Sequence, residues 1–461
     1  MSLTRRVALS VTRSQLQPWQ RLYSSTELDV RKGDRQRLVV IGSGWAGFGI
    51  IREVDKKKYQ TVVISPRSYF AFTPLLASTA VGTLEFRTAI EPVRRKGVEL
   101  YQAWAETVDF ENKSILVQSN LGAGLDKDQG GEKFTVKYDK LVIAPGAYSQ
   151  TFNIPGVAQH AYFLKDVSDA RRIRQRVLSN FELAALPTTS PAERDKLLHF
   201  AIVGGGATGV EFAAELHDLL HDDLPALYPT QGTKSLVEQH ARITIYDVAP
   251  RILGMFDTAL SEFAERHLKR EGVTVRPNHI VERVEPGMLH FKGGEAVQFG
   301  MLVWATGLAT NPFVARMKGI EKEPAHQARI LTDAKLRVLK EGGGAMEDVF
   351  ALGDCAMVKD GPVLPTTAQV ASQKAKYLVK HLNADDTNVT PDFVFKNFGA
   401  LAYLGGWRAI MQGESQNVKG WAAWVIWRGA YLTKSVSWRN KILIPTLWMI
   451  NWLFGRDISR F

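Results

Sequence analysis

Residues 37–47 read RLVVIGSGWAG and residues 200–209 read FAIVGGGATG. In each stretch an apolar run leads directly into closely spaced glycines, a pattern typical of a buried strand, a tight turn and the start of a helix. Such a turn lets backbone N–H groups approach a pyrophosphate at the N-terminus of the helix. The glycines of the two turns are Gly42, Gly44, Gly47, Gly204, Gly206 and Gly209. Two strand-led turns in one chain predict two bound dinucleotides, and the simplest reason to hold both is to pass a hydride between them.

The remaining sequence fits around these two units. Residues 348–354 (DVFALGD) read as a strand that returns the chain to the first unit. Residues 166–184 predict a helix, and residues 119–133 predict a surface hairpin loop. We expect an α/β fold with two Rossmann-like dinucleotide-binding domains and a C-terminal amphipathic helical segment. The predicted segments are a presequence (1–23), a linker (24–36), the first domain in two parts (37–165 and 308–394), the second domain (166–307) and a C-terminal region (395–461).

Composition limits the possible functions. The 461-residue chain has a formal net charge of +11, which favours anionic partners such as nucleotides, nucleic acid or acidic lipid. Its single cysteine, Cys355, excludes an intramolecular disulfide and the redox cysteine pair of disulfide reductases. No apolar run reaches the about 20 residues that span a bilayer. The ten histidines show no metal-ligand spacing, so no metal site is expected.

The N-terminus resembles a targeting segment. Residues 1–26 contain no acid, several serines and the arginines Arg5, Arg6, Arg13 and Arg21. This composition is typical of a mitochondrial presequence, and cleavage is expected after Tyr23. A disordered basic tail is the alternative.

The end of the second strand in each unit usually decides the contact with the adenosine ribose, where an acid hydrogen-bonds the 2′-OH. Asp247 follows the predicted strand 242–246 and fits this role in the second unit. Its charge would repel a 2′-phosphate, so NADH is expected over NADPH. A solvated strand-end residue is the alternative. The first unit carries Ser65, Pro66 and Arg67 there instead, so its ribose contact must come from a hydroxyl, the backbone or Arg67.

Asp354 follows a strand and a glycine late in the chain. An acid in this place can face the ribityl hydroxyls of a flavin, although a Gly-Asp pair alone is more often an ordinary turn. The flavin interpretation is supported by turns at matching positions after other strands, at Ala144, Gly146, Ala305, Thr306 and Gly307.

With these motifs the sequence resembles the type II NADH dehydrogenases, the alternative NADH:quinone oxidoreductases of mitochondria and bacteria, in their fungal form without an EF-hand. The resemblance runs from about residue 37 to the C-terminus. It is carried by residues 42–47, 65–70 (SPRSYF), 72–76 (FTPLL), 203–211 (VGGGATGVE), 305–307, 351–354 and 368–373 (AQVASQ).

The resemblance implies a non-proton-pumping flavoenzyme with non-covalently bound FAD, NADH as substrate and ubiquinone as acceptor. The FAD pyrophosphate would lie on Gly42, Gly44 and Gly47, the flavin along Pro74, and its ribityl chain at Asp354. NADH would lie on Gly204, Gly206, Gly209 and Asp247. Glu211 would point at the nicotinamide–flavin junction, and Ala368, Gln369 and Gln373 would line the flavin ring and the quinone pocket.

Two of these assignments have structural alternatives. An acid such as Glu211 in the first turn of a helix favours the macrodipole and needs no catalytic role. Gln369 and Gln373 lie one helical turn apart and can face one site, or they can form an ordinary exposed polar face.

The C-terminal residues 420–461 combine tryptophans with basic residues and hold a single acid, Asp457. Trp421, Trp424 and Trp427 recur every three residues and are expected on one helical face, and Pro445 is expected to start or kink the last helix. This pattern is typical of helices that lie on a membrane surface. Packing on the core or in a homodimer is the alternative, and the two are compatible.

The leading hypothesis is therefore a peripheral enzyme of the inner mitochondrial membrane, with the matrix side favoured and no nucleic-acid partner. Another ferredoxin-reductase-like NAD(P)H oxidoreductase shares the fold but gives no reason for the tryptophan-rich basic tail. A different class, an apoptosis-inducing-factor-like scaffold that binds NADH and FAD, would turn over quinone slowly.

Overall fold

The computed structural model describes residues 33–120, 131–323, 328–384, 391–414, 416–435 and 437–460. The predicted presequence, most of the predicted linker and the tip of the predicted hairpin loop lie outside these residues. No helix among the described residues is long and apolar enough to cross a membrane.

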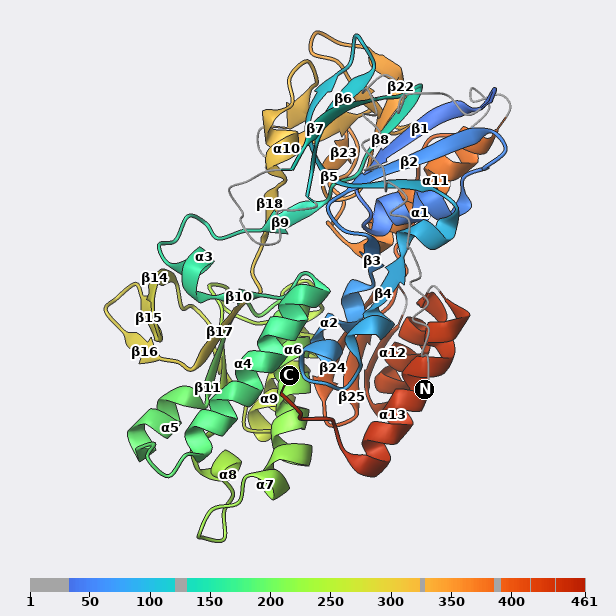
Figure 1. The fold of residues 1–461 in the computed structure, drawn as a ribbon. Coiled ribbons are helices and arrows are strands. Elements are labelled where there is room, and N and C mark those ends of the chain that lie inside the picture. Colours follow the sequence, from blue (N-terminus) through green and yellow to red (C-terminus); the bar gives the residue numbers. More distant parts are fainter. Residues whose placement is uncertain are drawn as a thin grey trace, which may run out of the picture.

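The first domain is built on one large sheet. Its central strands β8 (Lys140–Ile143), β1 (Gln36–Ile41) and β2 (Tyr59–Ser65) are parallel and buried on both faces, as their continuous apolar sequences require. Helices α1 (Trp45–Glu53) and α11 (Ala368–Asn383) pack together in this domain (Figure 1). The strand order is β19 (Lys322–Glu323), β20 (Arg329–Thr332), β21 (Arg337–Leu339), β22 (Ala345–Ala351), β8 (Lys140–Ile143), β1 (Gln36–Ile41), β2 (Tyr59–Ser65), β5 (Glu99–Asp109), β6 (Ser114–Ser119) and β7 (Lys133–Lys137), with β23 (Ala356–Val358) beside β20.

Distant parts of the chain complete this sheet. Strand β22 pairs in parallel with β8, so the chain rejoins the first domain after leaving the second. Strands β6 and β7 pair antiparallel on either side of the predicted hairpin loop. The short helix α10 (Pro312–Arg316) begins at the N-cap Asn311.

The second domain contains a five-stranded parallel sheet in the order β10 (Tyr162–Phe163), β17 (Met301–Trp304), β11 (His199–Val203), β12 (Arg242–Tyr246) and β13 (Thr274–Arg276). The α/β prediction with two Rossmann-like units is confirmed. The predicted helix is α4 (Val167–Ala185), whose N-cap Asp166 forms a capping box with Asp169. Because β10 already belongs to this sheet, the second domain begins before the predicted boundary at residue 166.

The long interval between the second glycine turn and Asp247 is helical. It contains α6 (Ala207–Asp218), the π-helical turn η4 (Leu219–Asp223), α7 (Leu224–Leu227) and α8 (Leu236–His240). The other elements of this domain are α3 (Val157–His160), α5 (Pro191–Leu197), α9 (Thr258–Arg270) and the antiparallel strands β14 (Val281–Glu285), β15 (Met288–Phe291) and β16 (Ala296–Gln298).

Two connections hold the domains together. The antiparallel pair β9 (Ala147–Ser149) and β18 (Leu308–Thr310) carries the chain out of the first domain and back. Between β3 (Tyr69–Ala71) and β4 (Ile90–Pro92), which pair with each other, the chain forms α2 (Leu76–Ala80). Helix α2 packs against α4 and α6, so its apolar residues join the core of the second domain.

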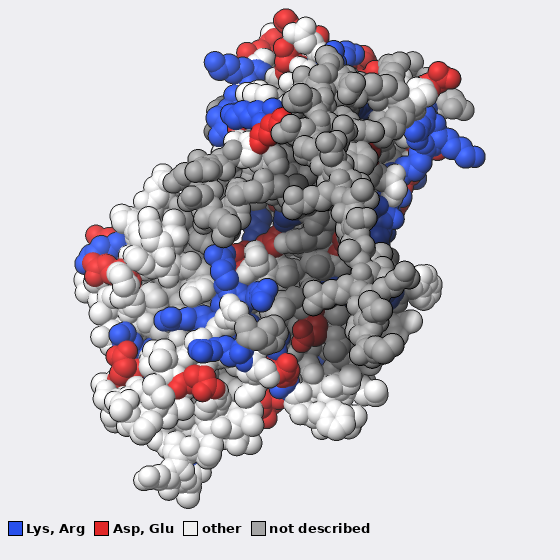
Figure 2. Space-filling view, viewed as in Figure 1, with Lys and Arg blue, Asp and Glu red and all other residues white. Residues whose placement is uncertain are grey.

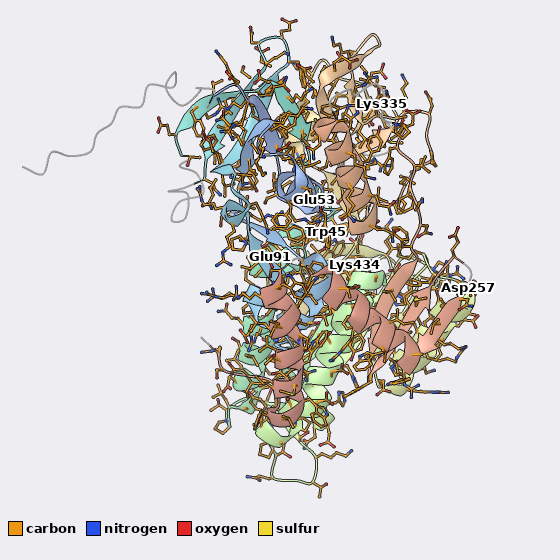
Figure 3. The ribbon with its side chains drawn as sticks, turned by 90° about the vertical axis from the view of Figure 1, so that its right-hand side faces the viewer. Trp45, Glu53, Glu91, Asp257, Lys335 and Lys434 are labelled. Atoms are coloured by element: carbon orange, nitrogen blue, oxygen red, sulfur yellow. The ribbon has the colours of Figure 1, made fainter. Side chains whose placement is uncertain are left out.

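The C-terminal region is not only helical, as predicted, but begins with a sheet. Strands β24 (Ala400–Gly405), β25 (Arg408–Gln412) and β26 (Asn417–Gly420) are antiparallel, and β24 packs on α6. Helices α12 (Trp421–Lys434) and α13 (Trp438–Phe454) follow and lie beside the domain junction. Figure 3 shows both helices from their own side, with Glu91 near the start of α13, where Asn440 donates a hydrogen bond to it at 2.9 Å.

The structure bears on two expectations about this region. Pro445 does not start α13 but lies inside it, seven residues after Trp438, and a kink at this residue stays a prediction. The three tryptophans of α12 do not share a face, since Trp421 is 67 % exposed and Trp427 is 4 % exposed. A three-residue spacing falls short of the 3.6-residue turn, so the side chains rotate steadily around the helix.

Candidate active site

A cavity of about 1070 Å³ lies where the two domains and the C-terminal region meet. Both glycine turns stand at the carboxyl ends of their strands, the edge at which open α/β sheets bind ligands. The predicted site residues that line this cavity are Gly42, Gly44, Ser65, Pro66, Arg67, Pro74, Ala144, Gly146, Glu211, Ala305, Thr306, Gly307, Asp354 and Ala368. The predicted residues outside its lining are Gly47, Gly204, Gly206, Gly209, Asp247, Gln369 and Gln373.

The first glycine turn has the geometry that a pyrophosphate needs. Gly42 has φ +102°, and a Cβ there would lie 2.2 Å from the carbonyl oxygen of Ala144. A Cβ on Gly47 would lie 2.0 Å from the carbonyl oxygen of Gly42, so the helix can approach the strand only without a side chain. Gly44 instead faces open space at the start of α1. The turn therefore leaves the helix N-terminus free for an anionic group.

The second turn repeats this arrangement. Gly204 has φ +116°, and a Cβ on Gly209 would lie 2.0 Å from the carbonyl oxygen of Gly204. Gly206 faces open space at the start of α6. Asp247 closes the turn, because its carboxylate accepts hydrogen bonds from the backbone N–H of Gly205 and of Ala249.

The first unit uses its Ser-Pro-Arg segment differently from an acid. Ser65 and Ser43 share a hydrogen bond of 2.9 Å between their hydroxyls at the edge of the cavity. Arg67 forms an ion pair with Asp166, which also accepts a hydrogen bond from the Tyr69 hydroxyl at 2.7 Å. The carboxylate therefore fixes the Arg67 side chain in the cavity wall after β2.

Lys165 is a candidate functional residue that the sequence alone did not indicate. Lys165 lines the cavity, and its Nζ is buried without a hydrogen-bond partner among the described residues. Burial lowers the pKa of Lys165 to about 8, while nearby Asp354 opposes the shift. Burial likewise raises the pKa of Asp354. An orphaned ammonium and a carboxylate in one cavity match a ligand rich in hydroxyls and phosphate, such as FAD, but a single lysine before a helix gives no recognisable motif.

Glu211 lies at the other end of the cavity, in contact with the C-terminal region. Its carboxylate accepts hydrogen bonds from the backbone N–H of Tyr403 at 3.2 Å and from Trp427 Nε1 at 3.4 Å. Burial raises its pKa to about 8. The macrodipole alternative is wrong, because α6 begins at Ala207 and Glu211 lies beyond its first turn.

Gln369 and Gln373 do share one face of α11, but both amides are occupied by backbone. Gln369 accepts from Phe398 N at 3.0 Å and donates to Gly399 O at 3.1 Å. Gln373 accepts from Lys396 N at 3.0 Å and donates to Lys396 O at 2.7 Å. These four bonds hold the segment 396–399 against α11.

Cys355 is unsuited to redox chemistry. Its thiol is buried and donates to the carbonyl oxygens of Leu352 and Ile143 at 3.4 and 3.5 Å. Burial raises its pKa to about 12. Any electron transfer in this site therefore needs a bound cofactor.

Comparison with known proteins agrees with this geometry. The model of the pyridine nucleotide-disulphide oxidoreductase family matches residues 36–375, and that of the NDH2 C-terminal domain matches residues 398–457. A probable NADH dehydrogenase of Dictyostelium discoideum is 40% identical over 93% of this chain and 92% of its own length. The internal alternative NAD(P)H-ubiquinone oxidoreductase A1 of Solanum tuberosum, a mitochondrial protein, is 38% identical over 94% of this chain and 90% of its own.

A solved structure extends the likeness to the whole fold. NDH2 from Plasmodium falciparum in complex with NADH superimposes with a TM-score of 0.84 at 26% identity, covering 92% of this chain and all of that one. Both the nucleotide-binding domains and the C-terminal region are thus matched by one family. This chain belongs to the pyridine nucleotide-disulphide oxidoreductase family and, within it, to the type II NADH dehydrogenases.

Proposed function

We propose that this protein oxidises NADH and reduces ubiquinone without pumping protons. The observation that carries the proposal is that one cavity is lined by the first glycine turn, by Lys165 and Asp354, and by Glu211 and residues of the C-terminal region. When bound, FAD supplies the redox chemistry, accepting a hydride from NADH and passing two electrons to quinone. The names of the Dictyostelium and potato relatives support the same activity.

The chain's own residues bind and orient the reactants. Gly42, Gly44 and Gly47 would admit the FAD pyrophosphate, and Asp354 and Lys165 would bind polar groups of FAD. The second turn and Asp247 bind NADH, with the Asp247 charge disfavouring a 2′-phosphate. Small or rigid residues leave room for the flavin ring: Pro74, Ala144, Gly146, Ala305, Thr306, Gly307 and Ala368.

Glu211 is the proposed proton donor. A carboxyl with a pKa near 8 is mostly protonated at pH 7. Burial causes this upward shift of the pKa, and the hydrogen bonds from Tyr403 and Trp427 oppose it. A general acid is most effective when its pKa lies near the working pH. Glu211 can therefore give a proton to a reduced quinone oxygen at the end of the cavity.

Gln369 and Gln373 are proposed as positioning residues for the quinone. Their amides fix the segment 396–399, which presents the exposed Phe398 beside α11. A fixed apolar edge here would guide the isoprenoid tail of a quinone toward the cavity.

The C-terminal helices are proposed to lie on a membrane surface. Large apolar side chains are exposed along both helices, and basic residues stand among them, with Lys441 Nζ 5.1 Å from the ring centre of Trp438. The exposed set is Trp421, Val425, Ile426, Trp438, Ile442, Met449, Ile450, Trp452, Leu453 and Phe454. Such a surface binds the headgroup region of an anionic leaflet.

Charge elsewhere is mixed. On the face seen in Figure 2, Lys and Arg side chains stand beside Asp and Glu side chains on both domains. We propose the matrix face of the inner mitochondrial membrane, which the word "internal" in the name of the potato relative supports. A homodimer formed through α12 or α13 is compatible with this placement.

The first experiment is steady-state NADH oxidation by the purified FAD-loaded protein with a soluble ubiquinone analogue, beside NADPH. Rapid quinone-dependent oxidation of NADH, with NADPH much slower, is the expected result. Bound flavin with negligible quinone turnover would overturn the proposal in favour of a scaffold. Flotation with cardiolipin-containing vesicles, compared with neutral vesicles, tests the membrane surface in parallel.

A further inference from the structure

Helix α6 carries an acid on every turn of one face. Glu211, Glu215 and Asp218 follow at intervals of four and three residues, and Asp222 in the π-helical turn η4 continues the row. Glu211 lines the cavity, Glu215 is 4 % exposed, Asp218 is buried and Asp222 is exposed. The row therefore leads from the active-site cavity through the protein interior to the surface.

Hydroxyl groups bind Glu215 and Asp218. Glu215 accepts hydrogen bonds from Ser78 Oγ at 2.6 Å and from Thr83 Oγ1 at 2.7 Å. Asp218 accepts from the Tyr403 hydroxyl at 2.6 Å. Tyr403 also donates its backbone N–H to Glu211, so one residue of β24 touches both ends of the buried part of the row.

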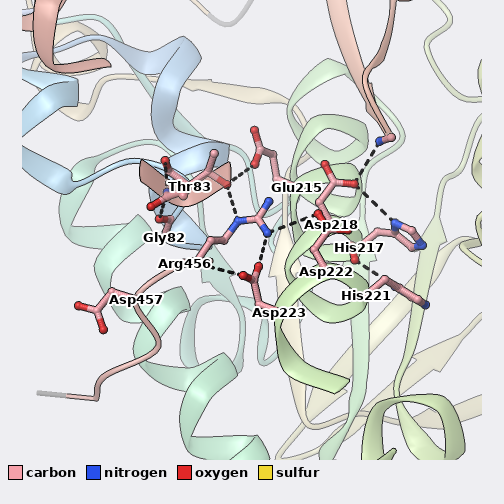
Figure 4. Close-up of polar contacts among 12 residues, drawn as sticks. Gly82, Thr83, Glu215, His217, Asp218, His221, Asp222, Asp223, Arg456 and Asp457 are labelled. Atoms are coloured by element: carbon pink, nitrogen blue, oxygen red, sulfur yellow. Dashed lines mark hydrogen bonds and ion pairs between the residues drawn. The ribbon is translucent and has the colours of Figure 1, made fainter. Parts of the chain in front are cut away.

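Two histidines stand at the outer end (Figure 4). His217 Nδ1 lies 3.7 Å from Asp218 Oδ1 and is buried without a hydrogen-bond partner among the described residues. The rings of His217 and His221 stack with centroids 4.0 Å apart, and His221 is exposed to solvent. A buried imidazole that faces a carboxylate, with a second imidazole outside it, is an arrangement that can accept a proton from water and pass it inward.

A guanidinium group partly offsets the negative charge of this row. Arg456 pairs with Asp223 and lies 3.7 Å from Asp222, while Thr83 Oγ1 accepts a hydrogen bond from Arg456 Nε at 3.0 Å. The full set of titratable and charged groups that face Glu215, Asp218 and His217 is Glu211, Asp222, Asp223, His221, Glu271, Tyr403, Arg428 and Arg456.

The protonation equilibria follow from these neighbours. Burial raises the pKa of Glu215, and the Asp218 carboxylate adds to the shift. Burial lowers the pKa of His217, but Asp218 and Glu271 raise it by more, so the net pKa is above the ordinary value. Near neutral pH Glu211 and Glu215 can thus hold a proton, and the outer imidazole of His217 can carry one.

We propose that this row, through Glu215, Asp218 and His217, delivers the solvent proton that quinone reduction consumes; the proposal rests on the function proposed above. In the overall reaction, NADH, one proton and quinone give NAD⁺ and quinol, so the quinone gains two electrons and two hydrogens. The hydride brings both electrons and one hydrogen, and the second hydrogen must come from water. As the quinol O–H forms, the Glu211 O–H breaks, and Glu215 then reprotonates Glu211 across one helical turn, a gap that one water molecule can bridge.

The test separates the two half-reactions. In anaerobic stopped flow, NADH bleaches the flavin in one mixing step, and a ubiquinone analogue reoxidises it in a second. For Glu215→Gln we expect flavin reduction within about two-fold of wild type, and reoxidation slower by about 10²-fold, as for loss of proton transfer by a positioned side chain. Asp218→Asn is expected to act in the same direction, and Glu215→Asp to restore most of the rate.

Thr79→Val is the matched control, because Thr79 is buried on the neighbouring helix α2, its hydroxyl donates to Leu76 O at 3.0 Å, and every carboxyl stays in place. It is expected to lower thermal stability and leave the solvent isotope effect on reoxidation unchanged. For Glu215→Gln the D₂O isotope effect should rise as proton delivery becomes limiting. An unchanged isotope effect and pH profile in Glu215→Gln, or an equal slowing in Thr79→Val, would refute the relay. Failure of wild-type enzyme to reoxidise with quinone would instead refute the proposed function.

Discussion

Replacing Glu211 by Gln should stabilise the protein in alkaline solution and leave its stability at acid pH nearly unchanged. The folded protein holds this carboxyl with a pKa of about 8, against 4.5 for an ordinary glutamate. Between these two values the unfolded chain has lost its proton while the folded protein retains it. Unfolding therefore releases a proton, and stability falls as pH rises through this window. A glutamine accepts the same two hydrogen bonds but has no proton to lose.

The magnitude follows from the size of the shift. At 1.36 kcal/mol per unit, a displacement of about 3.5 units costs the wild type at most about 5 kcal/mol above pH 8. An unfolding entropy of roughly 2.1 cal/mol/K per residue gives about 1 kcal/mol/K for this chain, so the variant should melt about 3–5 °C higher. At pH 4.5 or below, both proteins are neutral at this position and should melt together.

The assay is differential scanning calorimetry of the FAD-loaded wild type and Glu211→Gln at pH 4.5, 7 and 9. Quinone reduction by the wild type should fall as pH passes about 8, and the variant should be slow at every pH. Equal melting temperatures for the two proteins at pH 9 would show that the folded carboxyl titrates normally, and the proton-donor assignment would then lose its basis.

Gly42→Ala should abolish FAD binding and destabilise the first domain by about 2–5 kcal/mol, because the added Cβ would meet the Ala144 carbonyl at positive φ. Gly44 faces open space, so Gly44→Ala should fold normally and only weaken FAD retention. Flavin absorbance and the melting temperatures of both variants test this. Asp247→Asn keeps the hydrogen bond from Gly205 but removes the charge, so kcat/KM for NADPH relative to NADH should rise about ten-fold, or about 1.4 kcal/mol; an unchanged ratio would contradict the ribose assignment. Lys165→Met should raise the melting temperature of the apoprotein, since an unpaired buried ammonium is lost, yet weaken FAD binding in fluorescence titration; tighter FAD binding would contradict its role.

The glycine turns could be predicted from sequence because their causes are local. Gly42 and Gly204 adopt positive φ at a strand end, and any side chain there would strike the neighbouring strand, so the residue type follows from backbone geometry. The parallel strands were equally visible as continuous apolar runs. Asp247 was found for the same reason, since it follows its strand directly.

The surroundings of Glu211 could not be predicted, because they depend on residues far away in the sequence. Nothing near Glu211 shows that Tyr403 and Trp427 will enclose it, and its buried state decides its chemistry. Lys165 could not be predicted for a similar reason, because the lack of a hydrogen-bond partner for its ammonium group among the described residues depends on the folded cavity. The sheet β24–β26 was missed because the tryptophans and basic residues after it dominate the composition of the C-terminal region.

The environment of Glu211 is completed only late in synthesis of the chain. Its two hydrogen-bond donors leave the ribosome 192 and 216 residues after it, and Arg456, which pairs with Asp223 beside α6, follows later still. A nascent chain can complete both dinucleotide units while this carboxyl remains open to water and ionised. Premature stop codons in the last sixty or so codons should accordingly yield a protein that still binds its coenzymes but does not reduce quinone. Synthesis of the last segment of the chain is thus required for quinone reduction.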